Sequence, residues 1–170
     1  MERFSYNNAD VIITITEDMA DNIRSKTKNP DKVHVIRNWV DTDKIHPIAR
    51  EDNELFDELS LPHDRFYVTY AGNIGLMQGI ETIIFAAEQL KETPDIQFIL
   101  FGNGSEEANI RRLIEEKRLT NVRMFPLQSV ERVSEVYSLG DVSIVSCKPG
   151  TGAAGMPSKT WTIMATGTPI

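Results

Sequence analysis

The sequence predicts an α/β fold: a Rossmann-like parallel sheet with helices on both faces. Short β-branched apolar runs alternate along the chain with longer stretches of helical periodicity. Strands that alternate with helices favour right-handed crossovers, and such crossovers produce a parallel sheet. The continuous apolar run Phe98–Phe101 agrees, because the strands of such a sheet are buried on both faces.

The expected elements follow one another in a regular order. Strands are expected at Val11–Ile15, Val33–Ile36, Phe66–Tyr70, Ile96–Phe101, Val122–Phe125 and Val142–Val145. Helices are expected at Glu17–Thr27, Gln78–Lys91, Glu106–Arg118, Val130–Leu139 and Lys159–Ala165. Most of the later strands end in a glycine or proline, at Gly72, Gly102, Pro126 and Pro149.

Two boundaries divide the chain. Residues 38–50 begin with a polar, proline-ended stretch, which predicts a linker between residues 1–37 and the main sheet in residues 51–170. At the other end, Gly167 is expected to cap the last helix, and Thr168–Ile170 has the character of a strand beginning. Because a doubly wound sheet would continue, residues 51–170 are expected to form a domain that is incomplete at its C-terminus.

Composition and charge argue against several classes of protein. The 170 residues are 41% hydrophobic, and the formal charge of -7 argues against a nucleic-acid binder. The single cysteine, Cys147, excludes an internal disulfide framework, and the histidines at 34, 46 and 63 show no metal-ligand spacing. No apolar run reaches the length of a membrane span, and the N-terminus lacks a signal h-region. We therefore expect a cytoplasmic protein without a metal.

Two glycine turns follow expected strands. The first contains Gly72 and Gly79, and in an open parallel sheet such a turn lies where ligands bind. Its spacing matches neither the G-x-G-x-x-G fingerprint nor the P-loop, which argues against an NAD site and against a nucleoside triphosphatase. These glycines alone serve left-handed turns as readily as a phosphate. Gly102 and Gly104 fit a plain strand-to-helix turn better than ligand contact.

The segment from Pro149 to Thr160 is more informative. Its small residues 150–155 leave the backbone open to a ligand, and Ser158 is a good N-cap for the helix expected from Lys159. A lysine in the first helical turn opposes the macrodipole at a cost of about 0.3–1 kcal/mol. Beside an anion, the lysine and the helix end would act together. An anion site at Lys159 is therefore favoured over an accidental exposed lysine.

In this order, the segments resemble the nucleotide-sugar glycosyltransferases of the GT-B fold, in particular glycosyltransferase family 4. That family has two Rossmann-like domains, and the C-terminal one binds the donor. Residues 33–41 resemble the interdomain link, in which Asn38 and Asp41 match and Arg37 and Trp39 depart. The turns at 70–79 and 101–105 resemble the two glycine loops of the donor domain, and residues 157–169 resemble its donor-site helix in bacterial capsule, colanic-acid or O-antigen transferases.

The resemblance implies a donor site that departs from the family pattern. Asn73 and Gln78 stand where the family often has an arginine and a lysine, and its paired glutamates fall on Ala154 and Thr162. Two explanations stay open: a subgroup that holds its donor by backbone amides and Lys159, which we favour, or a pseudoenzyme. Lys159 is expected to stabilise the leaving diphosphate. The residues expected to bind the donor are Gly72, Asn73, Gln78, Gly79, Gly102, Gly104, Leu127, Gly155, Met156, Pro157, Ser158, Lys159 and Thr162.

The resemblance also implies an activity and partners. We expect transfer of a sugar from a nucleotide sugar, with uridine as the favoured base, to a glycan or lipid-linked acceptor in cell-surface polysaccharide synthesis. Retention of configuration is implied, and no cofactor is expected because the nucleotide sugar is a substrate. Since residues 1–37 match only the end of the acceptor domain, the isolated chain is expected to be inactive, and the missing domain could associate with the inner face of the membrane. A non-catalytic nucleotide-sugar binding module and a sugar-nucleotide epimerase of the same fold are the alternatives.

Overall fold

The structure is a computed structural model that describes residues 1–150 and 157–170. Contacts between Cα atoms divide the chain into two compact units. The first unit contains Met1–Trp39, and the second contains Val40–Pro149 and Lys159–Ile170. Each unit has its own parallel sheet.

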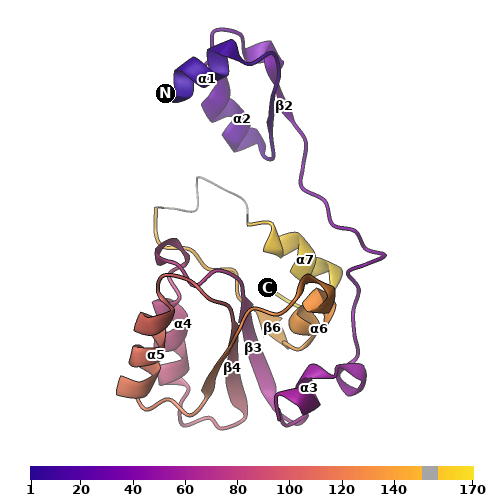
Figure 1. Cartoon of the computed structure of the whole chain (residues 1–170), viewed down its shortest axis with the longest axis vertical. Coiled ribbons are helices and arrows are strands. Elements are labelled where there is room, and N and C mark those ends of the chain that lie inside the picture. The colour runs from indigo at the N-terminus through magenta and orange to yellow at the C-terminus, as the bar shows by residue number, and fades with distance from the viewer. Residues whose placement is uncertain (151–156) are drawn as a thin grey trace. The chain divides into compact units, whose positions relative to one another are not determined.

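The first unit is a small βαβ arrangement (Figure 1). Strand β1 (Ile12–Thr14) pairs in parallel with β2 (Val33–Val35), and helix α2 (Glu17–Arg24) connects them. Helix α2 begins where the Thr16 side chain accepts a hydrogen bond from the Met19 amide, at 3.2 Å. Helix α1 (Glu2–Asn8) precedes β1, and a short 3-10 turn, η1 (Pro30–Lys32), precedes β2.

The second unit is built on a four-stranded parallel sheet in the order β5-β4-β3-β6. Its strands are β3 (Phe66–Ala71), β4 (Ile96–Phe101), β5 (Val122–Phe125) and β6 (Val142–Ser143). Its helices are α3 (Leu55–Glu58), α4 (Glu81–Gln89), α5 (Glu107–Glu116), α6 (Val133–Ser138) and α7 (Lys159–Ala165). Three 3-10 turns complete it, η2 (Arg50–Asp52), η3 (Leu76–Gln78) and η4 (Val130–Arg132).

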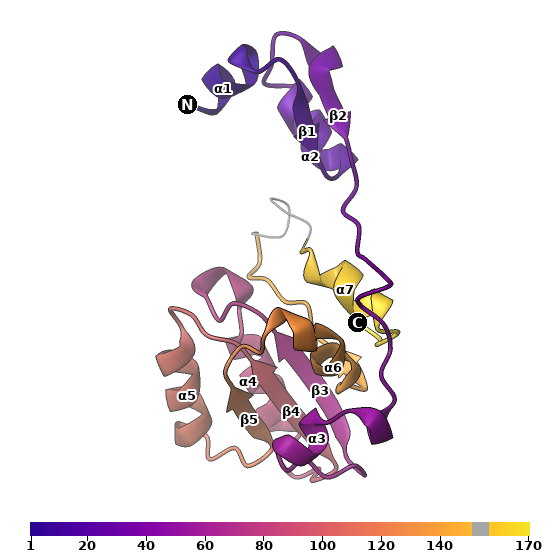
Figure 2. The ribbon, with the colours of Figure 1, turned by 45° about the vertical axis from the view of Figure 1, so that its right-hand side comes forward.

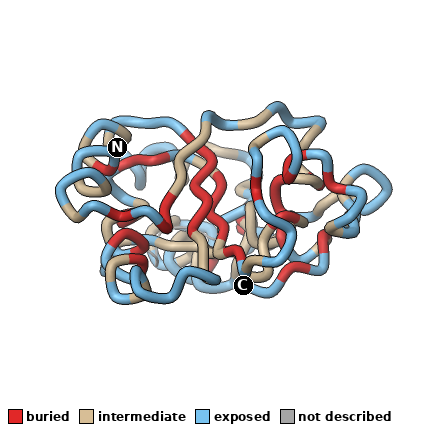
Figure 3. Tube along the Cα trace, turned by 90° about the horizontal axis from the view of Figure 1, so that it is seen from below, coloured by how far each residue is buried: buried red, intermediate tan, exposed pale blue. Residues whose placement is uncertain are grey.

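Helices cover both faces of this sheet. Helices α4 and α5 lie over one face, and α3, α6 and α7 lie over the other (Figures 1 and 2). Each face has its own core, and β3 contributes to both because alternate side chains point to opposite faces. Tyr67 packs in one core and Tyr70 in the other, both fully buried. The buried residues follow the strands through the middle of the unit (Figure 3), which confirms the predicted fold class.

Several features of the fold differ from the sequence-based expectation, and α2, for example, ends at Arg24 and not at Thr27. Strand β6 covers Val142–Ser143 and not Val142–Val145, because its pairing with β3 ends at Thr69. Helices α1 and α3 were not predicted. Helix α3 has only four residues, and α1 buries none of its seven, so its sequence shows no apolar period. The helix expected from Gln78 begins at Glu81, because η3 occupies the preceding residues.

The two ends of the predicted last helix behave as expected. Helix α7 begins at Lys159, and Gly167 follows it with a left-handed φ of +71°. Beyond it, the carbonyl of Pro169 accepts a hydrogen bond from the amide of Ser143 in β6, at 2.8 Å. The segment Thr168–Ile170 therefore meets the edge of the sheet at β6, without forming a full strand.

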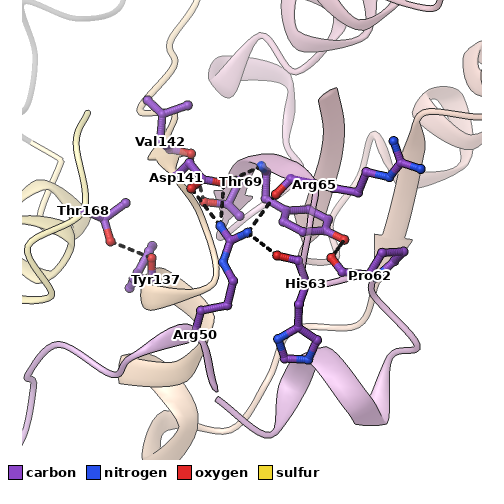
Figure 4. Close-up of polar contacts among 10 residues, drawn as sticks. Arg50, Pro62, His63, Arg65, Thr69, Tyr137, Asp141, Val142 and Thr168 are labelled. Atoms are coloured by element: carbon purple, nitrogen blue, oxygen red, sulfur yellow. Dashed lines mark hydrogen bonds and ion pairs between the residues drawn. The ribbon is translucent and has the colours of Figure 1, made fainter. Parts of the chain in front are cut away.

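Hydrogen bonds of Arg50 connect the segments at the amino-terminal end of the sheet (Figure 4). Its guanidinium donates to both carboxylate oxygens of Asp141 at 2.7 Å, and to the carbonyl oxygens of His63 and Arg65 at 2.9 and 2.8 Å. Asp141 also accepts a hydrogen bond from the amide of Tyr67, at 2.7 Å. One carboxylate therefore links η2, the start of β3 and the residue before β6.

The chain that leads into η2 is held by helix α6. The amide of His46 donates to the hydroxyl of Ser134 at 3.2 Å, and the amide of Ile48 donates to the hydroxyl of Ser138 at 3.0 Å. The Ser134 hydroxyl is 3.4 Å from the carbonyl oxygen of Lys44. Much of the predicted linker, residues 38–50, is therefore attached to the second unit.

Replacing Arg50 by methionine is expected to lower the free energy of unfolding by about 1–3 kcal/mol, because it leaves a partly buried carboxylate without its charged partner. The side chains of Arg50 and Asp141 are 29% and 30% exposed, against 59% and 53% for the pair Arg112–Glu116. Arg112→Met is thus the matched control, with an expected loss below about 0.5 kcal/mol. Urea titration of both variants measures this, and equal losses would contradict the assigned role of Arg50.

Candidate functional site

The carboxyl ends of the parallel strands β3, β4 and β5 lie together at one end of the sheet. Backbone hydrogen bonds continue to join the chain segments beyond the strands. The amide of Gly72 donates to the carbonyl of Phe101 at 2.9 Å, and that of Gly102 donates to Phe125 at 3.0 Å. The amide of Ile74 then donates to the carbonyl of Asn103 at 2.8 Å. The loops that follow β3 and β4 therefore leave the sheet as a paired unit. Ligands of open α/β sheets bind at this end.

The second glycine turn packs against the first. A β-carbon at Gly102 would lie 2.0 Å from the carbonyl oxygen of Gly72, and one at Gly104 would lie 2.4 Å from the carbonyl oxygen of Ile74. Any side chain at Gly102 would collide with backbone, which cannot give way cheaply. These contacts are with the neighbouring loop, as in the plain strand-to-helix turn that the sequence favours.

The turn from Gly72 to Gly79 carries neutral side chains where the family often has cations. Asn73 is exposed, and its amide nitrogen lies 3.4 Å from the side-chain oxygen of Gln78. Gly79 has a φ of +62°, a left-handed conformation that glycine adopts at little cost. The turn therefore offers amide donors and no charge of its own.

Lys159 places a positive charge beside the Gly72–Gly79 turn. Its ammonium nitrogen lies 4.1 Å from the ring centroid of Tyr70, and a β-carbon at Gly72 would come within 2.6 Å of that nitrogen. Within the described part of the chain, no carboxylate forms an ion pair with Lys159 and no acceptor forms a hydrogen bond with it. Burial lowers the pKa of its ammonium to about 8. A partly buried cation without a counter-ion is what an anionic ligand requires.

A small cavity opens beside these loops. It has a volume of about 70 Å³, and its lining includes Gly72, Phe101, Leu127, Ser129 and Tyr137. Leu127, which follows β5, is 54% exposed, so its side chain is available to a ligand. The cavity brings the predicted residues Gly72 and Leu127 to one place.

The remaining predicted donor residues lie at the start of α7. Pro157 and Ser158 are exposed and precede the helix directly. Thr162 lies one turn after Lys159, and its hydroxyl forms no hydrogen bond with the residues that the structure describes. Gly155 and Met156, like Ala154, lie outside the described residues, so their roles stay predictions.

Lys148 is a residue at this end of the sheet that the sequence did not single out. Its amide donates to the carbonyl of Met77 at 2.9 Å, and its ammonium lies 3.5 Å from a carboxylate oxygen of Glu81. A β-carbon at Gly79 would lie 3.2 Å from the Lys148 side chain. A second lysine thus packs against the Gly72–Gly79 turn. The available signal was its place in the segment that follows β6, directly before Pro149.

The cysteine and histidine side chains do not form a second candidate site among the described residues. Cys147 is an exposed free thiol, so it is not packed in the core. The three histidines are exposed and lie apart in the sequence. In residues 1–150 and 157–170, no group of three or more His, Cys, Asp or Glu residues could hold a metal ion. Among the same residues, no helix has the length and apolar character needed to cross a membrane.

Comparison with known proteins identifies the family. The family described as "Glycosyl transferases group 1" matches residues 51–170, and "Glycosyltransferase Family 4" matches residues 1–44. The chain belongs to the group 1 glycosyltransferases. The resemblance inferred from the glycine loops and the residues around Lys159 is thereby confirmed.

Individual relatives agree with this assignment. The putative colanic acid biosynthesis glycosyl transferase WcaI of Escherichia coli K12 is 32% identical over 98% of this chain and 41% of its own length. Sucrose-phosphate synthase from Thermosynechococcus elongatus superposes with a TM-score of 0.81 at 25% identity, over 99% of this chain and 41% of that one. HepE from Anabaena, solved with UDP-glucose, gives a TM-score of 0.77 at 16% identity, over 94% and 43% of the two chains, and shows the fold alone. The chain thus spans about two fifths of the length of two curated relatives, WcaI and the probable glycosyltransferase WbjE of Pseudomonas aeruginosa.

Lys159→Met is expected to raise the free energy of unfolding at pH 7 by roughly 1–2 kcal/mol, because it removes the cost of burying a charge that keeps part of its solvent contact. The folded pKa of about 8 lies below the ordinary value of 10.5, so the unfolded chain binds more protons between these pH values. Wild-type stability therefore rises with pH across this window, and the advantage of the variant shrinks.

Urea titrations of wild type and Lys159→Met at pH 7 and pH 10 measure this difference. The exposed Lys91 provides a control, and Lys91→Met is expected to change stability by less than about 0.5 kcal/mol at either pH. An advantage of Lys159→Met that is the same at both pH values would show that burial of the charge is not its cause.

Proposed function

We propose that this chain provides the donor-binding part of a glycosyltransferase that transfers a sugar from a nucleotide sugar, with UDP as the favoured leaving group. The observation that carries the proposal is the partly buried Lys159 ammonium at the carboxyl ends of the strands, which has no carboxylate partner among the residues that the structure describes. The UDP-glucose complex of HepE supports the class of donor. The description of WcaI as a colanic acid biosynthesis protein supports a glycan or lipid-linked acceptor in cell-surface polysaccharide synthesis.

The proposal assigns a role to each part of the chain. Residues 1–37 form the end of the acceptor domain, residues 38–50 the linker, and residues 51–170 the donor-binding domain. Separate family matches to residues 1–44 and 51–170 support a division in this region. The acceptor would be bound mainly by the rest of the first domain, so the chain alone is expected to bind the donor and not to turn it over.

Chemistry at this site is electrostatic. The leaving diphosphate gains negative charge as the glycosidic bond breaks, and a cation held in a poorly solvated place stabilises that charge strongly. Lys159 meets this requirement while it is protonated, below a pH of about 8. The amides of Gly72, Ile74 and Gln78 already donate to backbone carbonyls. The remaining amide groups of the turn at 72–79, with the side chains of Asn73 and Gln78, would donate hydrogen bonds to the same phosphates. Neither a metal nor a cofactor enters this mechanism.

One observation favours a second candidate, a non-catalytic nucleotide-sugar binding module. Asn73 and Gln78 are hydrogen-bonded to one another and uncharged, so the usual charged clamp on the diphosphate is missing. Such a module would bind the donor and leave it intact even in the presence of the rest of the protein. An epimerase is disfavoured, because the three histidines lie apart in the sequence and the described residues contain no cluster of three or more His, Cys, Asp or Glu side chains that could hold a metal ion.

Thermal denaturation of the 170-residue chain with UDP, GDP, ADP, NAD or UDP-sugars tests the donor site. A nucleoside diphosphate at a hundred times its dissociation constant is expected to add about 2.7 kcal/mol of stability, because it binds the folded chain alone. Lys159→Ala should abolish this gain, and Lys91→Ala, at an exposed position, should retain it. A cooperative transition that no nucleotide shifts would refute the donor site, and sugar transfer by this chain alone would refute the division of roles.

A further inference from the structure

We propose that Tyr70 is a positioning residue: its ring holds the Lys159 ammonium, and its hydroxyl holds the Gly72–Gly79 turn, so that both meet one diphosphate. This inference rests on the proposed function and extends it. It concerns a residue of the strand itself, beneath the loops that would contact the donor.

The first contact is between the Tyr70 ring and the ammonium of Lys159. The ammonium nitrogen lies 4.1 Å from the ring centroid, well within the range of a cation–π interaction. Tyr70 is fully buried in β3, so its ring is a rigid platform. Lysine has a flexible stem that would otherwise carry its charge toward solvent. The ring therefore fixes the position of a charge for which the described residues provide no carboxylate partner.

The nature of this platform is important for an anion site. A carboxylate in the same place would also hold the lysine, but it would cancel the charge that the ligand needs. An aromatic face attracts the cation through its quadrupole and carries no net charge. Lys159 therefore keeps its full charge for a diphosphate. The lack of a carboxylate partner for Lys159 among the described residues is consistent with this arrangement.

The second contact is between the Tyr70 hydroxyl and the turn. The hydroxyl donates a hydrogen bond of 2.7 Å to the carbonyl of Asn73. It would also lie 3.7 Å from a β-carbon placed at Gly72. Burial raises the pKa of Tyr70 to about 12, so the hydroxyl remains a donor at neutral pH. One side chain thus touches both groups that the proposed function assigns to the diphosphate.

Tyr67 provides a matched control on the same strand. It is also fully buried, and its hydroxyl also donates to a backbone carbonyl at 2.7 Å, that of Pro62. Its ring lies beside Arg50 at the amino-terminal end of the sheet and packs in the other core. Substitutions at Tyr67 and Tyr70 therefore remove equivalent groups from the same strand, and only those at Tyr70 touch the candidate site.

The test measures UDP affinity by calorimetry for Tyr70→Leu, Tyr70→Phe, Tyr67→Leu and Tyr67→Phe in the 170-residue chain. Tyr70→Leu is expected to weaken binding at least tenfold, because the lysine loses its platform. Tyr70→Phe keeps the ring and loses one hydrogen bond, so a loss of about threefold is expected. Both Tyr67 variants should bind UDP as the wild type does. Equal losses in the two leucine variants would overturn the inference.

A second readout does not depend on the nucleotide. Lysines methylated with ¹³C give one NMR signal each, and Lys159→Arg assigns the signal of Lys159. Proximity to the ring should shift that signal upfield in wild type and in Tyr70→Phe, and Tyr70→Leu should abolish the shift. An unchanged Lys159 signal in Tyr70→Leu would overturn the inference while leaving the proposed function intact. Absence of UDP binding by wild type with the shift present would instead refute the proposed function, and with it the role of Tyr70 at a diphosphate.

Discussion

The pairing of β3 with β4 on one side and β6 on the other is the constraint on which the candidate site depends. Hydrogen bonds of this pairing continue past Ala71 into the loops, so the turn at 72–79 starts from a fixed position. The glycines after β4 allow that turn to rest on its neighbour without a side chain between them. At its other end, β3 is tied to Asp141 and Arg50. The turn at 72–79 is thus built on a strand that is held at both ends.

Local sequence signals account for most of the architecture. The bounds of β4, β5 and α7 agree with the predicted ones, because the apolar residues of the strands, the turn residues after them and a well-marked helix start are visible without tertiary contacts. The end of strand β6 could not be predicted from its local sequence. Its sequence Val142–Val145 is uniformly suited to a strand, and only the geometry of the neighbouring β3 decides where the pairing stops.

The residues of the candidate site also differ in whether the local sequence or only the tertiary structure reveals them. Lys159 could be found from sequence, because a lysine at a helix start is electrostatically misplaced unless an anion is near. Tyr70 could not, because its contact with Lys159 joins residues that are far apart in the chain and depends on how α7 packs on the sheet. Lys148 could not be predicted for a similar reason. Its contact with Gly79 depends on the position of the loop after β6, which lies beside η3.

The attachment of residues 44–50 to helix α6 and to Asp141 has a mechanical consequence. A connection that is bonded at His46, Ile48 and Arg50 cannot act as a free swivel over its whole length. Any pivot between the two units must therefore lie upstream of these bonds. Tension on the chain would reach α6 first, and α6 packs beside α7, the helix that starts with Lys159. A pull on the residues that precede His46 would therefore be transmitted through α6 to the helix that begins with Lys159.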